Sequence, residues 1–283
     1  KVSKILPLGL KDYGLDVNKI DASDKDNLVN LQSYTGVYGM YQPDTLASYR
    51  WNNTDFIVTA NEGDSRDYAA FSEEARAGDL VLDPNHPQFA AAKDKTQLAR
   101  LKVTKSMGDD DKDGDYDKVV SFGARSFSIW NADGQQVFDS GSDFERITAA
   151  LLGDKFNNNN EENKGDSRSD DKGPEPEALA LGQIGQRLYA FVGLERTSGF
   201  MIYDVTNPFD VHFVDYVVNR DFEADFVVDT ATGAVKGDAT LAGDLGPEGM
   251  KFVSADKSPN GNPLLIIGNE VSGTTSVYQL KIK

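Results

Sequence analysis

Short apolar runs rich in β-branched and aromatic residues alternate along most of the chain with turns rich in Gly, Asn and Asp, a pattern typical of short antiparallel strands. One arrangement of these runs occurs three times. Each copy places an acidic residue directly after a Pro, continues through an apolar strand and a turn, and closes a second strand on Glu. The copies extend from Pro43 to Glu62, from Pro176 to Glu195 and from Pro247 to Glu270. We therefore predict a repeated hairpin.

The spacing within the copies supports a common structure. Pro and Glu are 19 positions apart in the first two copies and 23 apart in the third. A further strand follows each copy, at residues 127–130, 200–203 and 275–278. A fourth strand is indicated in two copies, at residues 136–139 and 212–216. In the first copy, roughly 60 residues separate the closing Glu from the third strand, which predicts an insertion there.

Four short antiparallel strands, repeated, are the unit of a β-propeller. We predict one all-β domain over residues 1–283, with blades near residues 40–150, 174–220 and 245–283 and an insertion over residues 63–121. A β-sandwich is the alternative. Propellers have about four to eight blades, so we expect the chain to be the C-terminal part of a larger propeller. The missing blades would come from an N-terminal segment or from another copy of the chain.

Helical patterns interrupt the predicted strands. Residues 72–80 begin with acidic side chains, and residues 87–101 are rich in Ala and Lys with Pro at the first turn, so we expect an α-containing insertion. Residues 144–152 indicate another short helix. The polar segment 153–175 has so few apolar residues that we expect it to be mobile unless ions hold it in place.

The net charge of the chain indicates which kinds of molecule it can bind. The chain has 46 acidic and 29 basic residues, a net charge of −17, which argues against nucleic acid or an anionic membrane and favours cations. It has no Cys, which excludes disulfides and thiol chemistry. No run approaches the about 18 apolar residues of a membrane span.

An acidic loop in the insertion predicts a calcium site. Asp occupies alternate positions, and a Gly permits the sharp turn of an EF-hand-type loop. The twelfth position is Val120 instead of the usual Glu, so one ligand would have to come from elsewhere. A solvated acidic turn is the alternative. The predicted ligands are Asp109, Asp111, Asp113, Asp115 and Asp117.

The repeat predicts a second acidic site. In an antiparallel hairpin, the start of the first strand and the end of the second lie at the same edge, so carboxylates from all three copies would converge at the mouth of a propeller channel. They would bind metal ions or a cationic ligand, unless each one caps neighbouring backbone N–H groups. The predicted metal ligands are Glu62, Glu177, Glu195, Glu248 and Glu270, with Asp44 as a ligand-binding residue.

Cationic side chains are predicted on the same face. The motif Gly-Asp-Ser-Arg occurs at residues 63–66 and 165–168, and its arginines suit planar or phosphate oxyanions. Asp–Arg pairs that merely fix the loops are the alternative. The predicted ligand-binding residues here are Asp64, Arg66, Arg168, Lys172 and Arg196.

The sequence lacks the motifs of several common catalytic and nucleotide-binding sites. The two histidines, His86 and His212, are not at zinc-site spacing, and the chain has no Gly-x-Ser-x-Gly elbow, P-loop or Gly-x-Gly-x-x-Gly motif. A Ser-His-Asp hydrolase is therefore not expected.

Four longer motifs carry a resemblance to a known family. Residues 61–68 (NEGDSRDY), 121–130 (SFGARSFSIW), 170–177 (DDKGPEPE) and 268–275 (GNEVSGTT) resemble the choice-of-anchor I family of exported bacterial proteins, which is related to mesenchyme-specific cell-surface glycoproteins of biomineralising animals. The resemblance spans nearly the whole chain. It implies a secreted or surface-anchored β-propeller with further N-terminal blades. Members often carry alkaline phosphatase or phytase-like labels, but the resemblance supplies no catalytic residues.

Two functions are consistent with these features. The first is an exported, Ca²⁺-binding surface or extracellular module, with a mineral, matrix or phosphate-containing ligand as candidate partner. The second is a metal-dependent phosphoesterase, in which the carboxylates hold metal ions and Arg66, Arg168 and Lys172 bind phosphate. The first is favoured, because no general acid or nucleophile stands out.

Overall fold

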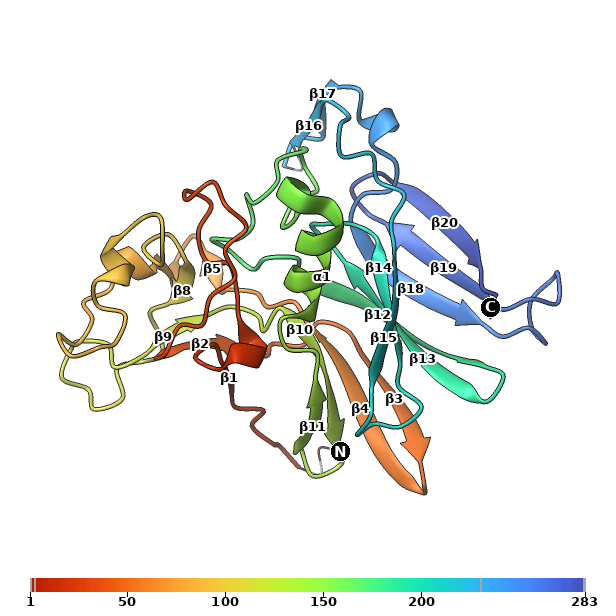
Figure 1. Cartoon of the computed structure of the whole chain (residues 1–283), viewed down its shortest axis with the longest axis horizontal. Helices are drawn as coiled ribbons and strands as arrows, with labels where there is room; N and C mark the ends of the chain where they lie inside the picture. The colour runs from red at the N-terminus through yellow and green to blue at the C-terminus, as the bar shows by residue number, and fades with distance from the viewer. Residues whose placement is uncertain (1, 3, 230, 282–283) are drawn as a thin grey trace.

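The computed structural model describes residues 2, 4–229 and 231–281, and most of its regular elements are strands in antiparallel sheets. Three sheets follow the predicted repeat, and each is a meander in which strands adjacent in order are hydrogen-bonded neighbours. Figure 1 shows these sheets fanning out side by side. The all-β prediction is confirmed.

The first sheet has four strands, with the order β3-β4-β10-β11. Strand β4 buries Phe56, Val58 and Ala60, the alternation that makes one face of a sheet apolar. It pairs with β10 from Asn61↔Ser126 to Phe56↔Asn131, although the whole insertion lies between the two strands. The strands are β3 (Leu46–Trp51), β4 (Thr54–Asn61), β10 (Ser126–Asn131) and β11 (Gln136–Asp139).

The second sheet also has four strands, and the third has three. The second comprises β12 (Pro176–Ile184), β13 (Arg187–Leu194), β14 (Phe200–Asp204) and β15 (His212–Val217). The third comprises β18 (Pro247–Val253), β19 (Leu264–Asn269) and β20 (Thr274–Gln279). The predicted repeating unit of antiparallel strands is thus present in all three copies.

The first strands of the sheets bring the repeats together. Strand β12 lies against β18 on one side and against β3 and β4 on the other. Apolar side chains fill the spaces between neighbouring sheets: Phe127, Val192 and Tyr203 between the first and second, and Phe191, Leu265 and Ile267 between the second and third. The three sheets do not close a ring within the described residues, so the propeller and its blade count stay a prediction.

The insertion is not α-helical, which corrects the prediction for residues 72–80 and 87–101. Part of the first segment forms a strand instead, in which Glu74 lies opposite Thr104 of the neighbouring strand. In the second, the Asp94 carboxylate accepts hydrogen bonds from the Thr96 backbone N–H (2.9 Å) and hydroxyl, a local bond that competes with helix formation. Short 3₁₀ turns over Ala77–Asp79 and Ala91–Lys93 are what form instead.

The insertion and the N-terminal region share a five-stranded sheet with the order β1-β2-β9-β8-β7, in which β2 and β9 are parallel. This sheet covers its own apolar core, which includes Tyr13, Leu98 and Val119. Its strands are β1 (Leu10–Asp12), β2 (Val37–Met40), β7 (Glu74–Arg76), β8 (Lys102–Thr104) and β9 (Val119–Ser121). The insertion also contains a small hairpin of β5 (Asp67–Tyr68) and β6 (Phe71–Ser72).

The predicted helix near residues 144–152 is confirmed as α1 (Asp143–Leu152), which packs Phe144 and Ile147 into the core between the first and second sheets. The remaining elements are a hairpin of β16 (Phe226–Asp229) and β17 (Ala234–Gly237) and 3₁₀ turns at Asp16–Asn18, Gly153–Lys155 and Ala239–Ala242. Among the described residues, no helix has the length and apolar character needed to cross a membrane.

Candidate functional site

The repeat places its carboxylates at one edge of the three sheets, as the hairpin geometry predicts. The residue before the Pro has a left-handed backbone in every copy: φ is 37° at Gln42, 53° at Glu175 and 71° at Gly246. This bend brings the start of the first strand beside the end of the second. Pro176 lies opposite Leu194 and Pro247 opposite Asn269, while the Asp44 N–H donates to the Ala60 carbonyl (3.1 Å).

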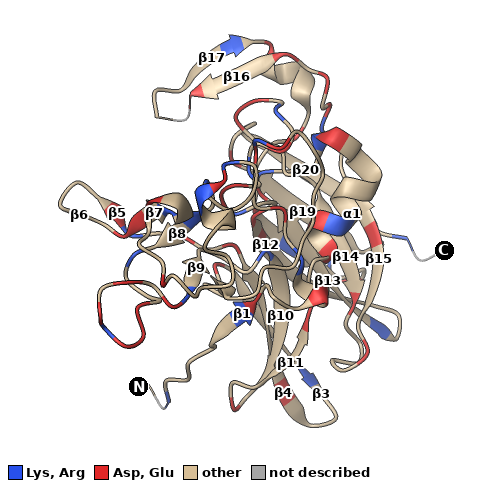
Figure 2. Cartoon of the chain, turned by 60° about the vertical axis from the view of Figure 1, so that its left-hand side comes forward, with Lys and Arg blue, Asp and Glu red and all other residues tan. Residues whose placement is uncertain are grey.

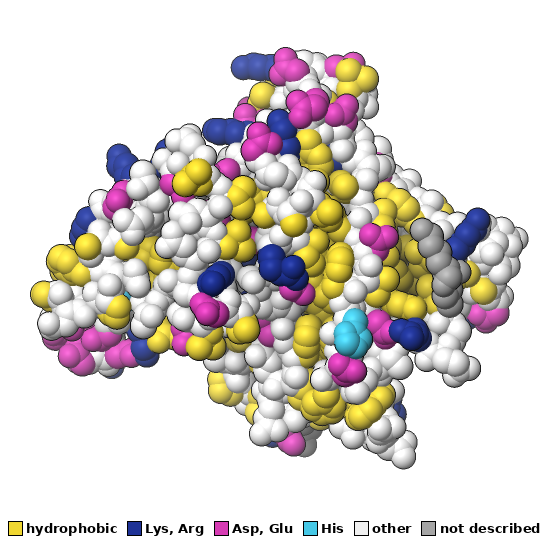
Figure 3. All heavy atoms as spheres, viewed as in Figure 1, with side chains coloured by type: hydrophobic (Ala, Val, Ile, Leu, Met, Phe, Trp, Pro, Cys, Tyr) yellow, Lys and Arg dark blue, Asp and Glu magenta, His cyan; other side chains and the backbone are white. Residues whose placement is uncertain are grey.

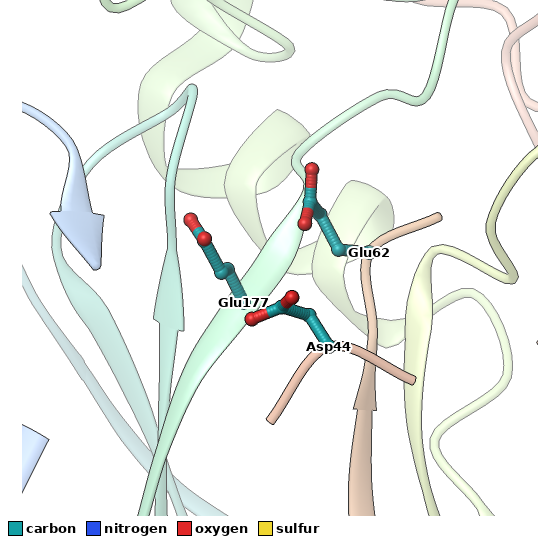
Figure 4. Close-up of side chains that lie close together, drawn as sticks. All are labelled: Asp44, Glu62 and Glu177. Atoms are coloured by element: carbon teal, nitrogen blue, oxygen red, sulfur yellow. The ribbon is translucent and has the colours of Figure 1, made fainter. Parts of the chain in front are cut away.

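Three of these carboxylates form a compact group. Figure 4 shows Asp44 and Glu62, at the two ends of the first hairpin, close to Glu177 at the start of β12. One carboxylate oxygen of each lies within 4.8 Å of the others. We call these three residues the acidic triad.

Glu177 is the buried member of the acidic triad. Its side chain is only 9% exposed, and its Oε2 atom has no hydrogen-bond partner. Burial, reinforced by Glu195, Glu62, Glu248 and Asp44, raises the pKa of Glu177 to about 9. This carboxyl group therefore needs either a proton or a bound cation at neutral pH.

The other predicted carboxylates adjoin the acidic triad. Burial and the nearby Glu175 raise the pKa of Glu195 to about 8, and Asn160 donates a hydrogen bond to its Oε1 (3.1 Å). Burial and a hydrogen bond with Glu248 raise the pKa of Glu270. The structure thus gathers all six carboxylates that the repeat pointed to; their role in binding stays a prediction.

The cations predicted on this face surround a residue that sequence reasoning missed. Glu175 is fully buried and contacts Arg168, Lys172 (Nζ–Oε2 2.8 Å) and Arg196 (Nε–Oε2 3.3 Å). Burial alone would raise the pKa of Glu175, but the attraction of the three cations outweighs burial and lowers it. We call Glu175 with its three partners the cationic cluster.

Lys172 joins the cationic cluster to the acidic triad. Its ammonium also lies 2.5 Å from Glu62 Oε1 and donates to the Gly63 carbonyl (2.7 Å). Burial opposes its charge, but Glu175 and Glu62 raise its pKa, so Lys172 is a fixed cation. A second group of three carboxylates, Glu62, Glu175 and Glu195, is also close enough to hold a metal ion, but protein cations already neutralise Glu175 at its centre.

A polar pocket of about 280 Å³ opens beside the cationic cluster and includes the predicted Asp64 in its lining. Each cation that lines it has an acidic partner: Lys102 pairs with Glu74 (3.3 Å), and Arg168 pairs with Asp171 (3.0 Å) as well as Glu175. The alternative of Asp–Arg pairs that fix loops therefore describes these side chains well.

Arg66 does not join this group. Its guanidinium forms a two-pronged ion pair with Glu73 (Nη2–Oε2 2.7 Å, Nε–Oε1 3.1 Å) and lies over the Phe71 ring. The two Gly-Asp-Ser-Arg motifs meet at this pocket through Asp64 and Ser65 of the first and Arg168 of the second, while the Arg66 side chain pairs with Glu73. Ligand binding by these residues stays a prediction.

The polar segment 153–175, expected to be mobile, is anchored by two buried arginines that sequence reasoning also missed. Arg125 donates to the Ser169 and Asp171 carbonyls (2.8 Å each) and pairs with the buried Glu145 (2.9 Å). Arg220 donates to Asn158 Oδ1 (3.0 Å) and to the Asn159 carbonyl (2.5 Å). Hydrogen bonds from these two arginines therefore hold much of the segment in place.

The predicted calcium loop lies apart, at the surface of the insertion, where Figure 2 shows a run of acidic residues. Asp109, Asp111 and Asp113 each place a carboxylate oxygen within 4.8 Å of the others, while Val120 is buried in β9 and supplies no ligand. Gly114 has a φ of 104°, as the sharp turn requires. Desolvation and the charge of the neighbouring Asp113 raise the pKa of both Asp111 and Asp115. Asp117 instead accepts a hydrogen bond from the Asp110 N–H (2.8 Å).

Comparison with known proteins identifies the family. Gigasin-3a of Magallana gigas is 32% identical over 176 residues, which are 60% of this chain and 60% of that protein. The mesenchyme-specific cell surface glycoprotein of Strongylocentrotus purpuratus is 28% identical over 278 residues, 84% of this chain and 35% of that protein. The chain thus spans less than two thirds of each relative, and no solved structure matches it. The model of the choice-of-anchor I domain matches residues 1–208, and the chain therefore belongs to the choice-of-anchor I domain family.

Proposed function

We propose that this domain is an extracellular or cell-surface binding module that takes up Ca²⁺ at the acidic triad and at the loop of residues 109–117. The family, and a relative named as a cell surface glycoprotein, support the location. The three sheets would be blades of a propeller, and the acidic triad would lie at the mouth of its channel.

The buried, unpartnered Oε2 of Glu177 carries this proposal. A buried carboxylate without a partner is costly, and two further carboxylates lie within 4.8 Å. Ca²⁺ removes this cost, since it binds carboxylate oxygens and tolerates irregular geometry. Three carboxylates supply only part of the six to eight oxygens that Ca²⁺ takes. The exposed side of Asp44 leaves the rest for water or an anionic ligand.

A metal-dependent phosphoesterase receives less support. Arg168 and Lys172 would have to leave Glu175 in order to bind phosphate, and Arg66 pairs with Glu73 away from the acidic triad. The module would therefore bind its ligand through the metal ion, without hydrolysis.

The test is a Ca²⁺ titration of metal-stripped protein by calorimetry, with the melting temperature and the hydrolysis of a generic phosphate ester followed in parallel. We expect two classes of site. Glu177→Gln should remove one and Asp111→Asn should weaken the other, while Asp133→Asn, at an exposed turn, should change neither. Unchanged Ca²⁺ binding in Glu177→Gln would refute the acidic triad as a metal site. Hydrolysis that disappears in that variant would instead support the phosphoesterase.

A further inference from the structure

A pocket that shares no lining residue with the acidic triad, the cationic cluster or the loop of residues 109–117 lies between two loops of the chain. Its lining comes from residues 24–29 of an N-terminal loop and from residues 154–167 of the polar segment. Figure 1 shows the first loop in red beside the second in green. The pocket has a volume of about 310 Å³, at the small end of the range typical of ligand sites.

The N-terminal loop contributes apolar side chains to the lining. Leu28 is 62% exposed and Val29 is 42% exposed, and both line the pocket. Figure 3 shows hydrophobic side chains at the surface in the region where Figure 1 places this loop. A ligand with an apolar part would therefore bury surface against them.

Backbone contacts hold the second loop in shape, so this side of the pocket is already formed. The Asp166 N–H donates to the Phe156 carbonyl (2.8 Å), and the Ser169 N–H donates to the Asp166 carbonyl (3.1 Å). A Cβ atom at Gly165 would lie 1.8 Å from the Asp154 carbonyl oxygen, so only glycine permits the two arms of the loop to approach this closely.

The charged residues of the lining are mostly acidic, and they are only partly compensated. Asp24 forms ion pairs with neighbouring basic residues. Lys164 is the one basic residue that lines the pocket within the described part of the chain, and it lies 3.9 Å from Glu162. Asp154 and Asp166 have no basic partner among the described residues. The pocket therefore has an excess of negative charge.

Asp166 is the carboxyl group on which this excess acts most strongly. Burial raises the pKa of Asp166 to about 7, and the charges of Asp21, Asp26 and Asp24 act in the same direction. A hydrogen bond from the Ser169 hydroxyl (2.6 Å) opposes them only in part. A cation in the pocket would stabilise the ionised form of this group.

The spacing of the carboxylates favours an organic cation over a metal ion. Among the described residues, the three groups of carboxylates close enough to hold a metal ion lie elsewhere. An organic cation needs fewer oxygen contacts, and its carbon stem gains from apolar surface. Lys and Arg side chains combine these features, with an apolar stem and a charged end.

We propose that this pocket binds an organic cation, an ammonium or guanidinium group carried on a short apolar stem. The cation pairs with Asp166 and Asp154, while the stem contacts Leu28 and Val29. A basic side chain of another polypeptide and a free polyamine both supply this chemistry, and the net charge of −17 attracts either one.

The test is a titration of the metal-stripped full chain with hexylamine, followed by the NMR shifts of backbone amides, up to about 10 mM, ten times a millimolar Kd. A chelator keeps Ca²⁺ away, so the result does not depend on the proposed function. We expect saturable shifts around Leu28 and Asp166. Hexanol, which has the same stem without the charge, should bind at least tenfold more weakly.

Asp166→Asn removes the charge and keeps an oxygen that can accept the Ser169 hydrogen bond. We expect its affinity for hexylamine to fall at least tenfold, because a hydrogen bond to a charged group is lost. Asp133→Asn, at an exposed turn, is the matched control and should bind as the parent does. Melting temperatures of both variants check that the fold is retained.

Four results would overturn the proposal: no saturable shifts at the pocket, hexanol that binds as tightly as hexylamine, an Asp166→Asn variant that binds as tightly as the parent, or Ca²⁺ that displaces hexylamine from the pocket. Two further probes separate the sources of the cation. A capped peptide with one central Lys that binds at least as tightly as hexylamine supports a basic side chain, whereas tighter binding of spermidine than of the peptide supports a free polyamine.

Discussion

The cationic cluster and the acidic triad are adjacent, and the buried carboxyl group of each has a pKa shifted in the opposite direction from the other. Glu175 and Glu177 are separated only by Pro176, and both are largely buried. Three cations lower the pKa of Glu175, whereas burial and four other carboxylates raise that of Glu177 to about 9. Burial opposes ionisation of both groups, so the number of nearby cations decides which one is charged.

This difference indicates which of the two groups stabilises the fold and which one is available to bind a ligand. In the cationic cluster, the protein supplies the compensating charge, so the cluster fixes the polar segment to the first strand of the second sheet. In the acidic triad the protein supplies no compensating charge to Glu177, and a proton or a metal ion must do so. Ligand binding is therefore expected at the triad, and changes at the two places should have different effects.

The largest effect is expected from Glu175→Gln. Removal of this carboxylate leaves Arg168, Lys172 and Arg196 half-buried without their common partner. We expect the free energy of unfolding in urea to fall by about 3–5 kcal/mol, the usual cost of breaking a buried ion pair on one side. Asp133→Asn, which removes an exposed pair with Lys4, should cost less than about 1 kcal/mol. Equal losses in the two variants would show that the cationic cluster does not hold the loop.

An effect of opposite sign is expected from Glu177→Gln without metal. The unfolded chain loses this proton near the ordinary pKa of 4.5, but the folded protein keeps it up to about pH 9. Between these values the folded state binds more protons, so the stability of the metal-stripped protein should fall as the pH rises. Glutamine removes this penalty, and at pH 8 the variant should be more stable by at least about 1.4 kcal/mol, the equivalent of one pKa unit.

Melting temperatures measured between pH 5 and pH 9 in a chelator check this prediction. Saturating Ca²⁺ should restore the parent at high pH and leave Glu177→Gln much less affected. A parent whose stability rises over this pH range would contradict the assignment of a buried, uncompensated carboxyl group.

The smallest effect is expected from Asp111→Asn in the loop of residues 109–117. Asp111 is exposed, so without metal the stability should hardly change. Only the Ca²⁺ affinity of the loop should fall, as calorimetry would show. A large loss of stability in the chelator would mean that the loop is structural even without its ion.

The repeated hairpins and the position of their carboxylates could be predicted from the sequence. The order and spacing of the strands determine which ends of a hairpin lie together. A hairpin whose first strand starts at Pro176 and whose second ends before Glu195 must bring those ends together. The residues around Glu177 were predicted for this reason. The family resemblance was likewise confirmed, since long local motifs carried it.

The contacts that sequence reasoning missed are between residues distant in the chain. The role of Glu175 depends on Arg196, and that of Arg125 on carbonyls of residues 169 and 171, and no local pattern reports such contacts. One signal was available for Glu175: its equivalents are Gln42 and Gly246, so only the second copy places a charge before the Pro. The helices expected in the insertion failed because pairing with β8 and the local bonds of Asp94 outweighed helix propensity.

The pairing of β4 with β10 has a consequence for the order of folding. Residues 62–125 must be looped out before these two strands can meet, whereas only residues 195–199 separate β13 from β14. The entropy of loop closure favours the short connection, and contacts between distant segments form slowly. We therefore expect the second sheet to form early, with the first sheet completed only after the insertion has collapsed on its own core. Pulsed hydrogen exchange would then protect the amides of β13 before those of β10, and the acidic triad, which draws on both sheets, would be among the last features to form.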